Sequence, residues 1–190
     1  DSSGNIRFKR IQHRWKNGRC EWCGTSEDQF GEKKREGLET HAYEFIHTGK
    51  LKEMFGMKFD VIIGNPPYQL DTGGAGRQAR PIYHLFVEQA IKLNPRFLSM
   101  IIPSRWFAGG MGLDEFRETL LKDKRIKSVT DYVNAKDCFP QNSISGGVCY
   151  FLWSRDYHGS CEFINVENNS HVNSMDRDLD EFSVLIRYNE

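Results

Sequence analysis

The chain has 190 residues with 26 Lys and Arg against 26 Asp and Glu, so its formal charge is zero. This balance excludes a globally basic coat for nucleic acid, and any nucleic-acid contact must be local. At 38% hydrophobic and 27% charged residues the composition is that of a folded globular protein, and its apolar runs are too short to cross a membrane. Five cysteines, an odd number, disfavour a disulfide framework and favour a reducing cytoplasm.

The two ends of the chain carry opposite charge. Residues 1–19 hold six basic side chains against one acidic one, and residues 162–190 are acidic in compensation. The basic stretch, interleaved with aromatic residues, predicts either a segment that follows a phosphate backbone or a solvated amphipathic segment. We expect residues 168–180 to form a solvated loop.

A pair of cysteines lies close to the basic stretch. Cys20 and Cys23 are separated by two residues and followed by Gly24, the spacing of a zinc knuckle. A structural zinc site is four-coordinate, and no second close cysteine pair exists in the sequence; His41 and His47 can complete the set in principle. The pattern therefore leaves two interpretations, a zinc site at Cys20 and Cys23 or two ordinary thiols.

Apolar strands and amphipathic helices alternate through the middle of the chain. A β-branched run predicts a buried strand over residues 59–63, which Gly64 and two prolines end. Helical spacing of apolar residues then predicts a helix over 82–93, after Pro81. The further expected elements are a strand at 97–102, a helix at 113–122, and strands at 126–133 and 147–153. This order predicts an α/β fold with crossover connections.

The residues that follow the first strand are where an open α/β sheet binds its ligand. They are Asn65, Pro66, Pro67 and Tyr68. Two successive prolines fix two φ angles and remove two backbone donors, so the remaining polar groups are preset acceptors for an amino group. Tyr68 adds a flat face on which an unstacked base can lie. Taken alone, the tetrapeptide also fits a simple strand-ending turn.

The string from residue 59 to residue 68 resembles the catalytic strand and loop of the adenine-N6 DNA methyltransferases of restriction-modification systems, especially the Eco57I-like type. The resemblance continues in order along the chain. Segments similar to that subgroup occupy residues 41–48, 81–86, 101–107 and 145–152.

This resemblance implies a fold, a cofactor and a set of site residues. The fold would be α/β, a partial Rossmann-like sheet of an S-adenosylmethionine-dependent methyltransferase with an N-terminal extension. Asn65, Pro66 and Tyr68 would be catalytic, and Pro67 would contact S-adenosylmethionine. The implied domains are an N-terminal basic and cysteine-pair segment at 1–56, a catalytic half-domain at 57–155, and a segment at 156–190 that begins a target-recognition region.

The resemblance also implies double-stranded DNA with a flipped adenine as the partner. Arg77, Arg80 and Arg105 are the expected nucleic-acid contacts, because they stand beside the loop or in the next one. The glycine-rich turn that holds the cofactor in the family does not precede residue 59, and the glycines at 73–76 suit a base-side loop better. We therefore expect a fragment that works with the remainder of a parent polypeptide and is inactive alone.

Two alternatives remain at this point. The loop suits any planar amino group, so a methyltransferase acting on a protein glutamine or an RNA base is one. A noncatalytic DNA-binding or subunit-docking module, in which the cysteine pair and basic arm matter, is the other. His84 and Tyr83 lie in a predicted helix and are expected to pack instead of catalysing, and Cys138, Cys149 and Cys161 are expected to be small buried hydrophobes.

Overall fold

The protein is described by a computed structural model at residues 13–21, 24, 26–30, 41–69, 80–142, 144–168 and 170–189. Contacts divide the chain into two units. The first, called the helical unit, comprises Asp1–Phe59 and Pro67–Leu93, and the second, called the sheet unit, comprises Asp60–Pro66 and Asn94–Glu190. In the described residues no helix is both long and apolar enough to span a membrane.

The helical unit combines a short hairpin with four helices. The hairpin pairs β1 with β2 across Asn17 and Gly18, whose positive φ angles of 51° and 71° suit a tight two-residue turn. The elements are β1 (Trp15–Lys16), β2 (Arg19–Cys20), α1 (Glu27–Phe30), α2 (His41–His47), α3 (Leu51–Phe55) and α4 (Tyr83–Lys92).

Helix α4 is the longest helix of this unit and confirms the helix predicted after Pro81. Its buried residues recur at helical spacing and include Tyr83, Phe86 and Ala90. Gln89 donates 2.9 Å hydrogen bonds to the carbonyls of Phe45 and Thr48, at the end of α2 and just beyond it. Since these carbonyls have no helical partner, the buried amide both satisfies them and fixes α2 against α4.

The sheet unit contains one six-stranded mixed sheet with the strand order β3-β4-β6-β5-β7-β8. Its strands are β3 (Val61–Gly64), β4 (Phe97–Pro103), β5 (Ile126–Tyr132), β6 (Val148–Ser154), β7 (Cys161–Glu167) and β8 (Ser170–Arg177). Strand β3 runs parallel to β4, and because β6 is antiparallel to both β4 and β5, those two are parallel to each other. The predicted α/β class is confirmed, with the parallel strands expected of a Rossmann-like sheet.

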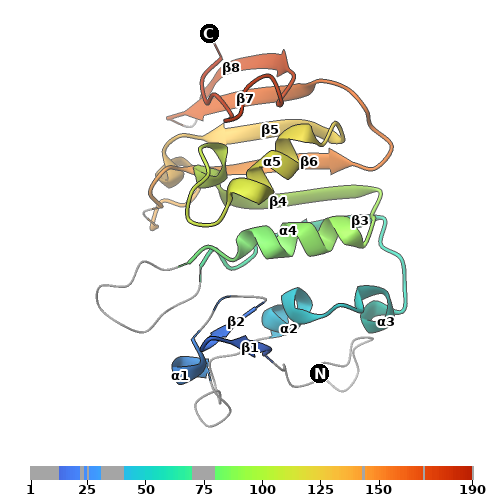
Figure 1. Ribbon diagram of the computed structural model, residues 1–190. Helices are drawn as coiled ribbons and strands as arrows, with labels where there is room; N and C mark the ends of the chain where they lie inside the picture. Colours follow the sequence, from blue (N-terminus) through green and yellow to red (C-terminus); the bar gives the residue numbers. More distant parts are fainter. Residues whose placement is uncertain are drawn as a thin grey trace. The chain divides into compact units, whose positions relative to one another are not determined.

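Two further elements lie on the connections of the sheet unit. A 3-10 helix, η1 (Ser104–Phe107), follows β4, and α5 (Asp114–Lys122) leads on to β5 across one face of the sheet (Figure 1). Another, η2 (Ala135–Asp137), follows β5. The side chains of Phe116, Leu120 and Leu121 are the buried face of α5. The predicted helix at 113–122 and the strands at 97–102, 126–133 and 147–153 are thereby confirmed within a residue.

The core of the sheet unit lies in its central strands. Leu98 and Ile102 of β4, Val129 of β5 and Trp153 of β6 are fully buried. Burial of each such side chain stabilises the fold by about 1.5–3 kcal/mol. The apolar runs of the sequence predict these strands well because each strand places several side chains in the core; along β4, half-buried and buried residues alternate as far as Ile102.

Two expectations about the sheet are wrong. The strand at 59–63 was expected to be buried, yet Val61 and Ile63 of β3 are 52% and 79% exposed, because within the described part of the chain β3 is an edge strand that pairs with β4 alone. Residues 168–180 were expected to be a loop, yet β8 occupies Ser170–Arg177. Its backbone pairs with β7 over the whole strand, so the ladder holds it although its sequence lacks an apolar face.

The segment after β8 also packs onto the sheet unit. Leu179 and Leu185 are buried, and the Leu185 amide donates to the Phe107 carbonyl at 3.0 Å. Asn165 of β7 donates to the Arg187 carbonyl at 2.8 Å, which ties this segment to the sheet. The acidic end of the chain therefore carries part of the core.

Candidate functional site

The loop predicted from sequence begins directly at the carboxyl end of β3. Gly64, the last residue of β3, is in register with Met100 of β4, and β4 continues to Pro103. The carboxyl ends of these parallel strands therefore lie along one edge of the sheet, the edge at which the strands end and not the side formed by β3. Asn65 is exposed at this edge, whereas Pro66 is buried. The exposed amide is open to a ligand, and the buried ring fixes the backbone that carries it.

Tyr68 belongs to the helical unit, together with the start of α4. Its carbonyl accepts a 3.1 Å hydrogen bond from the Ile82 amide, and Gln69 forms a bridge with Pro81. The half-buried Tyr68 ring meets the buried Tyr83 ring edge to face, with centroids 6.5 Å apart. This contact supports one side of the ring in a favourable aromatic geometry. Pro67, the residue expected beside the cofactor, is half-buried.

A buried polar network lies at the same edge of the sheet as Asn65. The Ser104 hydroxyl, just after β4, donates a 2.7 Å hydrogen bond to Oδ1 of Asp131 near the end of β5. Arg187 donates to both oxygens of that carboxylate, at 2.5 and 2.9 Å. Asp131 is fully buried, so this pairing supplies the compensation that a buried charge requires. Sequence reasoning missed the network, because its three members are far apart in the chain.

The network is packed against a buried thiol. Burial, and after it the negative charge of Asp131, raises the pKa of Cys149 to about 12, while the neighbouring side chains of Trp106 and Ser104 oppose the shift. Such a thiol stays protonated and unreactive at neutral pH. The expectation that Cys149 and Cys161 are buried hydrophobes is confirmed, whereas Cys138 is only half-buried.

Gly147 lies at the same edge of the sheet, directly before β6. Its φ is +80°, and its carbonyl accepts from the Ser104 amide at 3.1 Å. A Cβ atom at this position would meet the carbonyl oxygens of Tyr132 and Val133, which are backbone atoms and cannot give way cheaply. Glycine is therefore required both by the backbone conformation and by the close approach of two strand ends.

The three arginines expected to contact nucleic acid have different surroundings. Arg105 in η1 is exposed between the buried side chains of Ser104 and Trp106, and within the described residues it forms no ion pair. Arg80 is exposed in the helical unit, and its guanidinium lies directly against Gly24. Arg77 lies outside the described residues, as do the glycines at 73–76.

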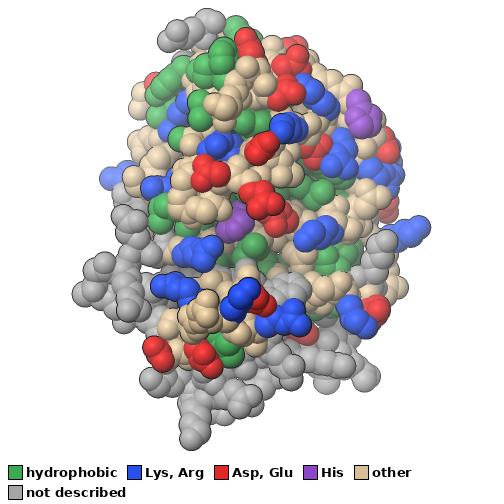
Figure 2. Space-filling view, viewed as in Figure 1, with side chains coloured by type: hydrophobic (Ala, Val, Ile, Leu, Met, Phe, Trp, Pro, Cys, Tyr) green, Lys and Arg blue, Asp and Glu red, His purple; other side chains and the backbone are tan. Residues whose placement is uncertain are grey.

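Much of the remaining surface charge of the sheet unit is internally balanced. On the face drawn in Figure 2, red and blue side chains are interspersed over this unit. Arg117 pairs with Asp114 at 2.8 Å, and Lys124 pairs with Asp178 and Asp180 at 3.0 and 2.7 Å. Within the described residues of this unit Arg105 forms no such pair, which is also true of Arg96, Lys127 and Lys136, and of these four cations it is the one that lies just after β4.

His84 is half-buried beside Tyr83 at the start of α4. Burial, and after it the charge of nearby Arg80, lowers the pKa of His84 to about 4. The imidazole is therefore neutral at pH 7. Tyr83 beside it is 1% exposed.

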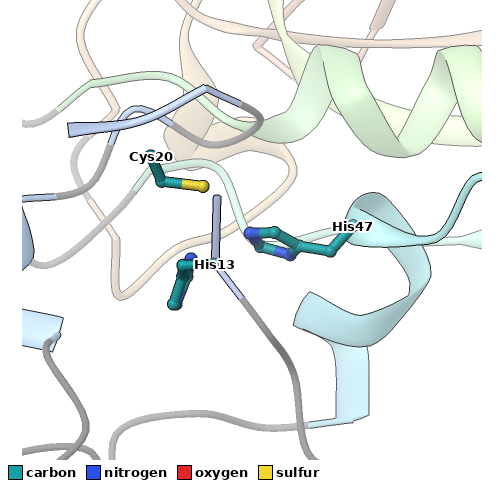
Figure 3. A group of neighbouring side chains, drawn as sticks. All are labelled: His13, Cys20 and His47. Carbon is teal, nitrogen blue, oxygen red and sulfur yellow. The ribbon is translucent and has the colours of Figure 1, made fainter. Parts of the chain in front are cut away.

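Of the expected zinc ligands, Cys20 is buried and Cys23 lies outside the described residues, as does the side chain of His41. The Cys20 sulfur lies near His47, one of the two histidines considered, and near His13, which sequence reasoning missed (Figure 3). Ligand atoms of these three residues all lie within 4.8 Å of one another. The basic stretch is described only from residue 13, where Arg14 and Lys16 pair loosely with Glu21.

The chain is similar to known proteins in both sequence and structure. An "uncharacterized adenine-specific methylase" of Mycoplasma pneumoniae is 38% identical over 179 residues, covering 86% of this chain and 42% of that protein. The chain thus spans less than half of this relative's length.

Among solved structures, a type I restriction-modification methyltransferase subunit from Streptococcus thermophilus has a TM-score of 0.44 at 16% identity, covering 66% of this chain and 32% of that one. A modification subunit of a putative type I restriction enzyme from Vibrio vulnificus has a TM-score of 0.42 at 15% identity, covering 70% and 30%.

A family model provides the assignment. The Eco57I restriction-modification methylase model matches residues 1–139, which include the hairpin, the loop after β3, helix α4 and strands β3 to β5. The match covers well over half of the chain, and the Mycoplasma relative agrees with it. The chain therefore belongs to the Eco57I restriction-modification methylase family.

Proposed function

We propose that the chain is part of a DNA adenine-N6 methyltransferase of a restriction-modification system, and that it supplies the groups that hold the target adenine. The observation that carries the proposal is the position of Asn65 and Pro66, directly at the carboxyl end of a strand parallel to its neighbour, in a chain of this family. Ligand sites of open α/β sheets lie at this place. A cytoplasmic location is part of the same proposal, because a restriction-modification enzyme acts on DNA there.

The chemistry starts from the weakness of the nucleophile. The amino group of adenine is delocalised into its ring, so its lone pair attacks poorly. In the proposed site the Asn65 side-chain oxygen and the Pro66 carbonyl accept its two hydrogens, which favours a tetrahedral nitrogen and stabilises the positive charge that develops there. Tyr68 stacks on the base once it has left the duplex.

The hydrogen-bond acceptors of this turn also fit S-adenosylmethionine, the cofactor that the family implies. Pro66 and Pro67 lack N–H groups, which leaves the carbonyls of Asn65 and Pro66 and the side-chain oxygen of Asn65 as preset acceptors. Acceptors suit both amine hydrogens and the positive sulfonium of S-adenosylmethionine. When bound, this cofactor supplies an electrophilic methyl group. Asn65 and Pro66 would hold the two amine hydrogens during the transfer, and one of them would then leave as a proton to solvent.

DNA is favoured over an RNA base because the matched family is one of restriction-modification methylases, and over a protein glutamine because the matched relative is named for adenine. Arg105 at the sheet edge is the proposed phosphate contact in the sheet unit, with Arg77 and Arg80 following the loop. The remaining length of the parent polypeptide is the proposed second partner, and it would complete the cofactor site. A noncatalytic docking module is the alternative that the experiment must exclude.

The test measures transfer of a labelled methyl group from S-adenosylmethionine to duplex DNA, with hydrolysis of the product to identify N6-methyladenine. In the parent protein, Asn65→Ala should lower transfer by about 100–1,000-fold, the loss typical of removing one preorganised polar group. Cofactor binding should stay near wild type. The exposed Asn142→Ala is the matched control and should retain full transfer. Undiminished transfer by Asn65→Ala would contradict the proposal, and labelled RNA or glutamine would establish an alternative substrate.

A further inference from the structure

Three side chains able to bind a metal converge in the helical unit, from three separate elements (Figure 3). His13 immediately precedes β1, Cys20 ends β2, and His47 ends α2. A ligand atom of each lies within 4.8 Å of a ligand atom of the other two. None of the three belongs to the loop after β3, so this cluster has no part in the proposed methyl transfer.

The surrounding packing fixes these side chains in place. The His13 and His47 rings meet edge to face with centroids 4.7 Å apart, and His13 also lies 4.9 Å from the Trp15 ring. Cys20 is 3% exposed and belongs to an apolar cluster with Ile46, Ile82 and Phe86. Two imidazoles and a thiol are thus held together at the border of an apolar core, where a metal ion would be shielded from solvent.

We propose that His13, Cys20 and His47 bind one zinc ion. Imidazole nitrogen and thiolate sulfur are the donors that zinc prefers, in tetrahedral geometry with bonds of about 2.0–2.1 Å to nitrogen and about 2.3 Å to sulfur. Ligand atoms around such an ion are about 3.4–3.7 Å apart by that geometry. Closing the cluster therefore requires a contraction of about 1 Å, within the reach of side-chain rotation. The fourth position is left to another ligand.

The site would have a structural role in the helical unit. It would join the β1–β2 hairpin to α2, and α2 is in turn held to α4 by Gln89. The hairpin strands have two residues each, and α2 has seven, so these elements bury little apolar surface of their own. In small elements of this kind, metal binding supplies folding free energy that the core cannot.

The experiment uses the full chain, loaded with zinc alone and then with Co²⁺ in its place. One equivalent of zinc should be retained after desalting, as measured by inductively coupled plasma mass spectrometry. The Co²⁺ form should show the visible bands of tetrahedral cobalt and a thiolate-to-cobalt charge-transfer band in the near ultraviolet. Removing zinc with a chelator should lower the melting temperature of the wild-type chain.

Ligand variants then test each residue against a matched partner. His13→Ala, Cys20→Ser and His47→Ala should each weaken zinc binding by at least about 100-fold, beyond the ~10–100-fold cost of losing an outer-shell group. Cys20→Ser should also lose the charge-transfer band. The half-buried Cys138→Ser and the exposed His158→Ala, both in the sheet unit, are the controls and should bind zinc as wild type does.

Four outcomes would overturn the proposal. They are a wild-type chain that retains no zinc, a Co²⁺ form without a charge-transfer band, a Cys20→Ser variant that keeps this band, and a Cys138→Ser control that loses zinc. The first two are measured on the wild-type chain, so they decide the matter even where a ligand variant fails to fold. Loss of zinc from the Cys138→Ser control would equally place the thiolate ligand elsewhere.

Discussion

At the scale of single residues, the chemistry depends on what a few side chains rest against. Tyr68 is half-buried with its ring edge-on to the buried Tyr83, and its carbonyl is fixed by the Ile82 amide. A base stacked on this ring would therefore meet a surface that needs little ordering, which reduces the entropic cost of binding. The contribution of such a ring is separable from that of its hydroxyl.

In the parent protein, Tyr68→Ala should weaken binding to DNA with a mispaired target adenine by about 1–3 kcal/mol, the usual worth of one stacked base. Tyr68→Phe should bind like wild type, because stacking requires the ring. Fluorescence anisotropy titrations at fixed salt would measure both. Equal losses in the two variants would indicate that the hydroxyl, through a hydrogen bond, is the group that matters.

At the scale of elements, the C-terminal segment is fastened to the sheet by the ion pair between Arg187 and Asp131. The carboxylate is fully buried, and its guanidinium partner is 23% exposed. Removing one member of such a pair leaves an uncompensated buried charge, which is far costlier than losing a pair at the surface. The ring of Phe107, 6.0 Å from the guanidinium, adds to the same contact.

Arg187→Ala should therefore lower the free energy of unfolding by about 3–5 kcal/mol. Urea denaturation followed by tryptophan fluorescence would measure it, since Trp106 and Trp153 are buried in this unit. Arg155→Ala is the control: Arg155 pairs with Asp156 at the surface, and its loss should leave the midpoint unchanged. A wild-type midpoint for Arg187→Ala would mean that Asp131 is compensated by other groups.

A second prediction at this scale is self-association through the edge strand β3. Val61 and Ile63 of this strand are exposed. Within the described residues, the backbone of β3 forms hydrogen bonds to β4 on one side and to no strand on the other. Such an edge is a template for another strand. The chain by itself should therefore self-associate with rising concentration, and Ile63→Lys should shift the equilibrium toward monomer. Sedimentation velocity would follow both, and indistinguishable profiles would argue against association through β3.

At the scale of the whole molecule, acid sensitivity follows from a single buried histidine. The pKa of His84 is about 4 in the folded chain against 6.5 in an unfolded one, because burial and Arg80 disfavour its charged form. Between these values the unfolded chain binds more protons than the folded chain, so stability rises with pH through this window. The stability that depends on neutral His84 is fully present above about pH 6.5 and is lost as the pH falls toward 4.

The free energy of unfolding should therefore fall by about 2–3 kcal/mol between pH 7 and pH 4 through His84, at about 1.4 kcal/mol per pKa unit. Urea titrations at several pH values would measure it. His84→Gln should flatten this part of the profile, whereas the exposed His158→Gln should not. Parallel profiles for wild type and His84→Gln would contradict the assignment.

Features that depend on neighbours in the chain were predictable from the sequence. The strand before Asn65, the loop with its two prolines, and α4 after Pro81 follow from local rules, because φ restriction and the periodicity of apolar residues act within a few residues. The α/β class follows from their order, and the prediction of Asn65 and Pro66 as site residues follows from their place after a strand.

Only the tertiary structure decided which distant residues meet. Asp131 lies 27 residues from Ser104 and 56 from Arg187, and nothing in the local pattern pairs them. The same holds for β8, whose polar sequence becomes a strand because β7 offers a ladder, and for His13, which reaches Cys20 and His47 through the hairpin. The sequence determined what each segment can form, while long-range contacts, whose entropic cost only the complete core offsets, decided what each segment contacts.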